Sequence, residues 1–416
     1  MFEHFFDVRA GHQQIEIPFV VMSYNKAPFR RESGASRGVV LDHSGSDGSR
    51  KATLIFPGGM SRSLEYLQTA LSEGRNVIGA SSLILDVSRE NYPAWTYLPF
   101  ITDPAFDAAL RQAILELNIG SIYSPNFVVW NCLKRALAEM GLDVTLVNDA
   151  PLDAELRGYR AARGHARALL DSPLALADCG AAKPSMPEIE LSVLFRHAEI
   201  IPGMCDHEKF CVLYEIARRS PAGDIVEIGS WWGKSAFILA RLARCYDIGN
   251  LLCVDPWSND HLVQPDATPL VNTVSAQADA EEALAVFEMN LLPYSANHAD
   301  APGLPQINYL RMPSVQGAQH YRTHRSATTA AFGSTSYCGR IAILHIDGNH
   351  SYAAAQADLA AWSELVVPGG WIVVDDYVWP YGDGPQRAGD EYLQQNFDRV
   401  GVAFVMGSAL FMQLAP

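Results

Sequence analysis

Three carboxylates and one imidazole stand at the ends of two apolar segments in the last third of the chain. Asp347 ends the first segment and is followed three residues later by His350. Asp375 and Asp376 end the second segment, 28 residues after Asp347. Parallel strands end at one edge of a sheet, so we expect the four side chains to meet there. Carboxylate oxygens are the ligands that Mg²⁺ prefers, and a nearby histidine can accept a proton from a bound hydroxyl.

The strands that would position these groups belong to an alternating series of apolar segments and helices, which is typical of a Rossmann-like α/β fold. The last two strands are joined by only three residues, too few for a parallel crossover, so we expect a hairpin that gives the sheet one antiparallel strand. The expected strands number seven: 224–228, 251–255, 308–312, 341–347, 370–375, 400–405 and 409–413.

Length and charge restrict the class of protein. The 416 residues suggest two domains, and 49% apolar residues suffice for two cores. The formal net charge of −15 argues against a nucleic-acid partner, because such binding needs clustered lysine and arginine. No apolar run is long enough to span a membrane, and the N-terminus lacks a basic leader before an apolar block. We therefore expect a soluble, cytoplasmic protein without a membrane partner.

Two domains and a linker are expected. Residues 1–170 form a smaller α/β domain, with a strand or hairpin at residues 14–22 and alternating strands and helices from residue 52. Residues 171–188 carry three prolines and little periodicity and are expected to be the linker, followed by a second α/β domain at 189–416. The first domain resembles the Rossmann-like domain that precedes the catalytic domain in ATP-grasp ligases, at Phe56-Pro-Gly-Gly59 and residues 97–104. A structural role is expected for this domain: it would build a homo-oligomer or form one wall of the substrate site.

A glycine-containing turn opens the second domain. An apolar strand leads into Glu227-x-Gly229-x-x-x-Gly233, after which a new helix begins. Glycines allow the backbone to turn sharply and lie close to a ligand, whose carboxylate can meet the free N–H groups at the helix start. The next strand ends in Asp255, where the diol of a ribose lies in doubly wound folds.

Residues 190 to 416, with this strand order and these motifs, resemble the class I S-adenosylmethionine-dependent methyltransferases. The resemblance implies that Glu227 and Gly229 border the methionine part of S-adenosylmethionine and that Ser235 is a further cofactor-binding residue. It implies that Asp255 binds the ribose hydroxyls and that Trp257 or Ser314 contacts the adenine.

The spacing of the acids and the histidine resembles that of metal-dependent O-methyltransferases. Sugar methyltransferases of the mycinamicin or macrocin type place a histidine at the position of His350, and they also carry a separate N-terminal domain. The resemblance implies that Asp347, Asp375 and Asp376 bind Mg²⁺ or another divalent cation, and that His350 and Asp347 are catalytic. In that group the residue at the position of Asp375 can be glutamate.

The function expected is methyl transfer to a sugar hydroxyl or another small diol, in natural-product or glycan biosynthesis. Polar stretches at 257–305 and 314–339 are expected to be long loops that act as substrate lids, with a helix expected at 280–290 in the first. One alternative is a metal-independent methyltransferase with His350 as the base. Another is a scaffold subunit that binds the cofactor without catalysis. A nicotinamide oxidoreductase is disfavoured, because the turn lacks the third glycine of G-x-G-x-x-G.

Overall fold

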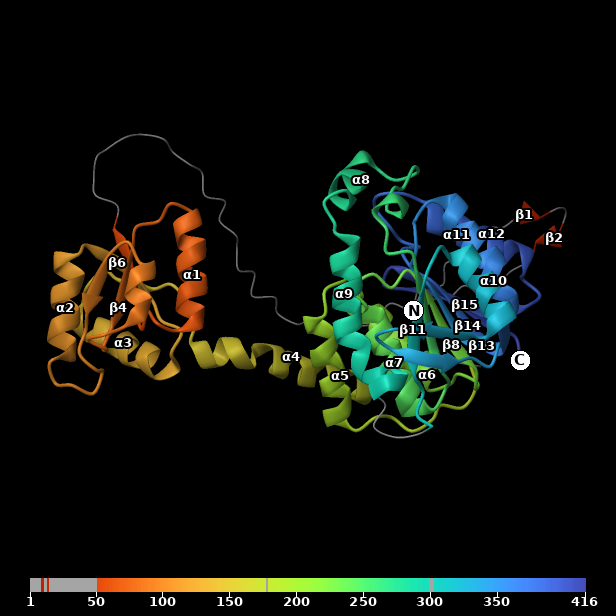
Figure 1. Cartoon of the computed structure of the whole chain (residues 1–416). Coiled ribbons are helices and arrows are strands. Elements are labelled where there is room, and N and C mark those ends of the chain that lie inside the picture. The colour runs from red at the N-terminus through yellow and green to blue at the C-terminus, as the bar shows by residue number, and fades with distance from the viewer. Residues whose placement is uncertain (1–8, 11–12, 15–50, 177–178, 299–302) are drawn as a thin grey trace. The chain divides into compact units, whose positions relative to one another are not determined.

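The computed structural model describes residues 9–10, 13–14, 51–176, 179–298 and 303–416. The strand or hairpin predicted at residues 14–22 lies outside them, apart from Gln14, which belongs to a short antiparallel pair of β1 (Arg9–Ala10) and β2 (Gln13–Gln14). The chain divides into two compact units: one lies within residues 30–161, and the other contains β1, β2 and the chain from Ala162, which lies inside helix α4 (Pro151–Asp171). Each unit is described here by itself (Figure 1).

The first unit contains a five-stranded sheet in the order β5-β4-β3-β6-β7, with all neighbouring strands parallel. The predicted alternation of strands and helices is present, and the three-residue strand β5 was too short to be predicted. The strands are β3 (Ala52–Ile55), β4 (Val77–Ser81), β5 (Trp95–Tyr97), β6 (Ile119–Tyr123) and β7 (Thr145–Leu146). The helices between them are α1 (Ser61–Ser72), α2 (Phe106–Glu116) and α3 (Phe127–Met140).

The second unit contains a seven-stranded sheet in the order β10-β9-β8-β13-β14-β16-β15. Its strands are β8 (Asp224–Ile228), β9 (Leu251–Asp255), β10 (Ile307–Arg311), β13 (Ile341–Ile346), β14 (Val366–Val374), β15 (Val400–Met406) and β16 (Ala409–Leu414). Only β16 runs against its neighbours in this sheet, and it pairs antiparallel with both β14 and β15. The predicted fold class and its terminal hairpin are therefore confirmed.

Two apolar layers cover the two faces of this sheet (Figure 1). One layer is made by α5 (Glu188–Ile200), α6 (His207–Ala217), α7 (Lys234–Tyr246) and α9 (Ala280–Leu291). The other is made by α10 (Ser314–His324), α11 (Tyr352–Trp362) and α12 (Gly384–Gln395). The core of the second unit thus lies on both sides of the central strands β8, β13 and β14.

Strand alternation assigns the polar side chains of these central strands to one face. Ile343 and Trp371 pack in the layer of α5, α6, α7 and α9. Glu227, His345 and Asp375 follow the same alternation, so their side chains face that layer too. This places three titratable groups below helix α6, whose residues from 209 to 217 are all buried.

One prediction about the loops is wrong. Residues 314–339 were expected to form a long loop, but they contain α10 and a hairpin of β11 (Ser326–Thr329) and β12 (Gly333–Ser336). The hairpin packs on edge strand β10, where the amide of Asn308 donates to the carbonyls of Ala327 and Gly333. These tertiary hydrogen bonds order a stretch whose polar composition alone indicates a loop.

The stretch after β9 is only partly helical, with α8 (Pro269–Ser275) and the predicted helix α9. Of the described residues of the expected linker, 171–176 and 179–188, Asp171 ends α4 and Glu188 begins α5, and the residues between them contain no helix or strand. Within the described residues, no helix is both long enough and apolar enough to cross a membrane.

Candidate active site

The glycine turn after β8 lies directly against the loop that carries Asp347. Gly229 has φ +78°, and a β-carbon there would overlap the backbone carbonyl of Asp347. The backbone N–H of Asp347 in turn donates to the carbonyl of Ile228 at 2.8 Å. Glycine is therefore needed at 229 both for the left-handed backbone and for the close approach of two strand ends.

Asp255 holds the same turn from the neighbouring strand. Its Oδ2 accepts the backbone N–H groups of Ser230 and Trp231, both at 3.0 Å, and its Oδ1 accepts that of Trp257 at 2.7 Å. Burial raises the pKa of Asp255, and these three N–H groups offset only part of that effect. The carboxylate that is predicted to bind a ribose therefore also holds the backbone of the glycine turn in place.

Glu227 is fully buried and has partners on two other strands. Its carboxylate accepts the hydroxyl of Ser230 at 2.6 Å and lies 3.1 Å from Nδ1 of His345. The thiol of Cys253 lies 3.7 Å from the same carboxylate. Because Glu227 has no oxygen that faces solvent, it contacts the turn only from the protein interior, through the hydroxyl of Ser230.

The other predicted cofactor residues occupy three different environments. Ser235 is buried in the first turn of α7. The indole of Trp257 is 1% exposed and packs on Phe287 and Tyr309, so this side chain belongs to the aromatic core. The hydroxyl of Ser314, at the start of α10, accepts the indole N–H of Trp362 at 3.0 Å.

A buried lysine occupies the position beside Asp375. Lys209, in the first turn of α6, donates from its ammonium to Oδ2 of Asp375 and to the carbonyl of Met204 at 3.3 Å. The same ammonium lies 3.9 Å from Oδ2 of Asp347. Burial alone would lower the pKa of Lys209 and raise that of Asp375, but their mutual attraction reverses both shifts. The pair is therefore ionised.

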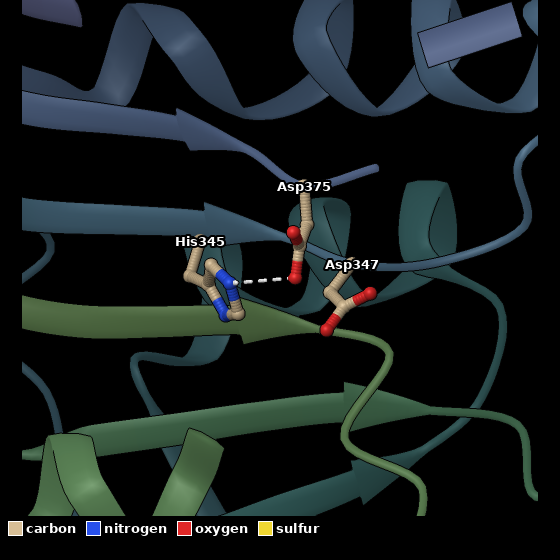
Figure 2. Close-up of side chains that lie close together, drawn as sticks. All are labelled: His345, Asp347 and Asp375. Atoms are coloured by element: carbon tan, nitrogen blue, oxygen red, sulfur yellow. Dashed lines mark ion pairs between the residues drawn. The ribbon is translucent and has the colours of Figure 1, made fainter. Parts of the chain in front are cut away.

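His345 completes the contacts on the buried side of the site. Its Nε2 lies 3.7 Å from Oδ2 of Asp375, as the dashed line in Figure 2 marks, and its ring points along the sheet toward that carboxylate. Burial alone would lower the pKa of His345, but the carboxylates of Asp375 and Glu227 more than offset this and raise it. Asp347 lies on the same side in Figure 2.

Asp347, His350 and Asp376 form the more accessible side. Nε2 of His350 lies 3.0 Å from Oδ2 of Asp376, and the three side chains are 14% to 22% exposed. Burial and the carboxylate of Asp375 raise the pKa of Asp347 well above its ordinary value, although Lys209 opposes this shift. A cation at this place would relieve the crowding of negative charge.

The four residues predicted from the sequence meet at one sheet edge, but as two sets. One set is His345, Asp347 and Asp375, and the other is Asp347, His350 and Asp376; in each set the ligand atoms lie within 4.8 Å of one another. Within the described residues, Asp347, Asp375 and Asp376 do not form one set by this measure. Asp347 is the residue common to both sides.

The loop after β13 is tied to the insertion that follows β9. The amide of Asn349 donates to the carbonyls of His261 and Val263, at 3.0 and 2.8 Å, and the N–H of Tyr352 donates to Asp266. On another side, Trp379 packs edge-on against His350 with ring centroids 4.6 Å apart. The insertion and Trp379 are therefore placed to form walls beside His350.

Lys209 was not predicted from the sequence, and no site role was predicted for His345. A lysine that begins a long apolar helix was the available indication for Lys209, because such a charge needs a buried partner. His345 lies on the same face of its strand as Asp347. Its two carboxylate partners come from other strands, so no local pattern indicates them.

Comparison with known proteins gives one family and several similar folds. Residues 226–377 match the family model described as a methyltransferase domain. No curated protein matches the chain. One similar solved structure is the O-methyltransferase NovP, at 18% identity, covering 64% of this chain and 100% of that chain with a TM-score of 0.35.

Two further solved structures are similar at the same level. CalS11, a TDP-rhamnose 3'-O-methyltransferase in calicheamicin biosynthesis, is 14% identical over 64% of this chain and 96% of that chain, with a TM-score of 0.35. MycE methyltransferase from the mycinamycin pathway, in complex with Mg, SAH and mycinamycin VI, is 17% identical over 65% and 62%, with a TM-score of 0.31. The family match falls on strands β8 to β14 of the seven-stranded sheet, so the chain contains a methyltransferase domain over these residues.

Proposed function

We propose that this methyltransferase transfers the methyl group of S-adenosylmethionine to a hydroxyl oxygen of a small acceptor, a sugar or another diol. The observation that carries this proposal is the pairing of His350 with Asp376, 3.0 Å apart and beside Asp347. A histidine oriented by a carboxylate is the arrangement that accepts a proton from a hydroxyl.

The cofactor is proposed to lie over the turn at Gly229, with its methionine part near the start of α7 and Ser235. Asp255 accepts three N–H groups, and a carboxylate can accept about four hydrogen bonds, so one position remains for a ribose hydroxyl. Ser314 is proposed at the adenine end. The buried indole of Trp257 supports a role for its backbone only.

The acceptor's proton is proposed to pass to His350. Within the described residues, Nδ1 of His350 is buried and has no hydrogen-bond partner, whereas Nε2 faces Asp376, so a bound acceptor must reach Nδ1 from within the site. If Nε2 carries the hydrogen and donates it to Asp376, Nδ1 is left as the proton acceptor. The acceptor oxygen then attacks the methyl carbon, the carbon–sulfur bond breaks, and S-adenosylhomocysteine leaves with the bonding electron pair.

A divalent cation is proposed at Asp347 and Asp376, whose part-exposed carboxylates are the hard oxygen ligands that Mg²⁺ takes. When bound, the cation would lower the pKa of a coordinated hydroxyl. A metal-independent reaction with His350 as the only activating group is the second candidate. It is favoured by Lys209, whose ammonium already balances one carboxylate of the site.

Two measurements test these proposals. Calorimetry with S-adenosylhomocysteine should give binding to wild type and weak or no binding to Gly229→Val. Incubation with S-adenosylmethionine, Mg²⁺ and a panel of nucleotide sugars and diols should give a product heavier by one methylene unit. Loss of this product on chelation, with recovery after added Mg²⁺, favours the metal-dependent reaction; full activity in chelator favours the alternative. The homo-oligomer stays a prediction for sedimentation analysis.

A further inference from the structure

Asp375 differs from the other two acids of the site in how completely its oxygens are engaged. Oδ1 accepts the hydroxyl of Ser408 at 3.2 Å and the backbone N–H of Asp376 at 2.9 Å. Oδ2 accepts the ammonium of Lys209 and lies 3.7 Å from Nε2 of His345. The side chain of Asp375 is only 2% exposed, and both of its oxygens already have partners within the protein.

The position of Lys209 is held by contacts that do not involve the site itself. Asp206 caps α6 by accepting the backbone N–H of Lys209, and it also accepts the N–H and the hydroxyl of Ser408. Ser408 lies in the turn between β15 and β16, and its hydroxyl lies between Asp206 and Asp375, so its single proton is shared between the two carboxylates. The start of α6, the terminal hairpin and the end of β14 are thus joined around one buried ion pair.

We propose that Lys209 is a positioning residue whose buried ammonium is the permanent counter-ion of Asp375, so that a divalent cation is bound by Asp347 and Asp376 without Asp375. This inference rests on the metal site of the proposed function and makes it more specific. A fixed ammonium 3.9 Å from Asp347 also holds that carboxylate at the boundary between the two sides of the site. The cation site then has two acidic ligands, and its remaining positions are left to water and to the acceptor.

The test is a titration of metal-free protein with Mn²⁺, followed by electron paramagnetic resonance, which needs neither acceptor nor activity. Asp347→Asn and Asp376→Asn should each weaken Mn²⁺ binding by about tenfold or more, because each removes a ligand charge. Lys209→Met should bind Mn²⁺ about tenfold more tightly, because it frees a carboxylate and removes a positive charge. Lys234→Met, which removes another lysine of the same unit, should change the affinity less than about threefold.

The decisive variant is the double substitution Lys209→Met with Asp375→Asn, which removes both charges of the pair and leaves the net charge unchanged. If Asp375 is only the partner of Lys209, this variant should bind Mn²⁺ within about threefold of wild type. Binding as weak as that of Asp347→Asn would overturn the inference. The double variant also guards against a misfolded Lys209→Met, because it leaves no unpaired buried charge.

Failure of the inference and failure of the proposed function give different results. Mn²⁺ binding to Lys209→Met but not to wild type would overturn the two-acid cation site, because binding would then require the freed Asp375, and it would contradict metal dependence. Absence of Mn²⁺ binding in all variants would overturn both the counter-ion inference and the metal site. Methyl transfer itself would be contradicted only if wild type also failed to bind S-adenosylhomocysteine in the calorimetry described above.

Discussion

Glu227 and His345 form a buried contact between two neighbouring strands, with 3.1 Å between the carboxylate oxygen and Nδ1. On its other side His345 faces Asp375, which binds Lys209. A continuous row of buried titratable groups therefore runs from the strand that carries the glycine turn to helix α6. Movement at the proposed cofactor turn would disturb the proposed acceptor side through this row.

Replacing His345 with leucine should destabilise the fold by about 3 kcal/mol, because two buried carboxylates lose the group between them. The free energy of unfolding in urea measures this loss. In the double variant His345→Leu with Glu227→Gln, the loss should be smaller than the sum of the two single losses. Strict additivity of the two losses would show that the contact carries no coupling energy.

The sequence predicted the framework of the site because each strand contributes a local pattern. An apolar run that ends in an acid fixes both the strand and the edge where its acid lies, which is why Asp255 and Asp347 are found where expected. The short connection before Ala409 fixed the antiparallel strand for a similar local reason.

The partners of these acids could not be predicted in the same way. Asp375 and Asp376 are neighbours at a strand end, so alternation turns their side chains to different sides, and Asp376 has φ +50°. Lys209 lies 166 residues before Asp375, and only the packing of α6 on the sheet brings them together. Local patterns therefore predicted where the acids lie, whereas tertiary packing decides which side chain each acid contacts.

Gly229→Ala should lower stability by at least about 2 kcal/mol, since it adds a clash with the carbonyl of Asp347 to an unfavourable φ of +78°. Binding of S-adenosylhomocysteine should weaken by about tenfold or more. Gly369→Ala is the matched control, because Gly369 has φ +74° but nothing within 4 Å of an added β-carbon. That control should cost only about 1 kcal/mol and leave binding unchanged; equal effects of the two variants would refute the close approach.

His350→Gln should reduce the rate of methyl transfer by about 100-fold or more, because glutamine cannot take the acceptor's proton. The affinity for S-adenosylhomocysteine should stay within about threefold, since His350 lies on the acceptor side. The rate is measured with the acceptor found in the panel, and the affinity by calorimetry. His298→Gln, at an exposed position, is the control. A variant that loses affinity but keeps its rate would place His350 in the cofactor site instead.

Asp358 predicts a dependence of stability on pH. Burial raises the pKa of Asp358 to about 6 from its ordinary value of 3.8, and its hydrogen bond with Ser314 offsets only part of this. The folded protein therefore binds a proton that the unfolded chain has released, so the contribution of Asp358 to stability falls as pH rises from about 4 to about 6. Above that range the cost amounts to about 3 kcal/mol.

Asp358→Asn removes this titration while keeping an oxygen that can accept from Ser314. The variant should be more stable than wild type by about 1 kcal/mol at pH 4.5 and by about 3 kcal/mol at pH 8. Urea unfolding at the two pH values measures the difference. Asp171→Asn, at an exposed position, should give no such change with pH. A stability gain of the same size at both pH values would mean that charge burial at Asp358 is not its cause, because only an ionising group makes the gain grow with pH.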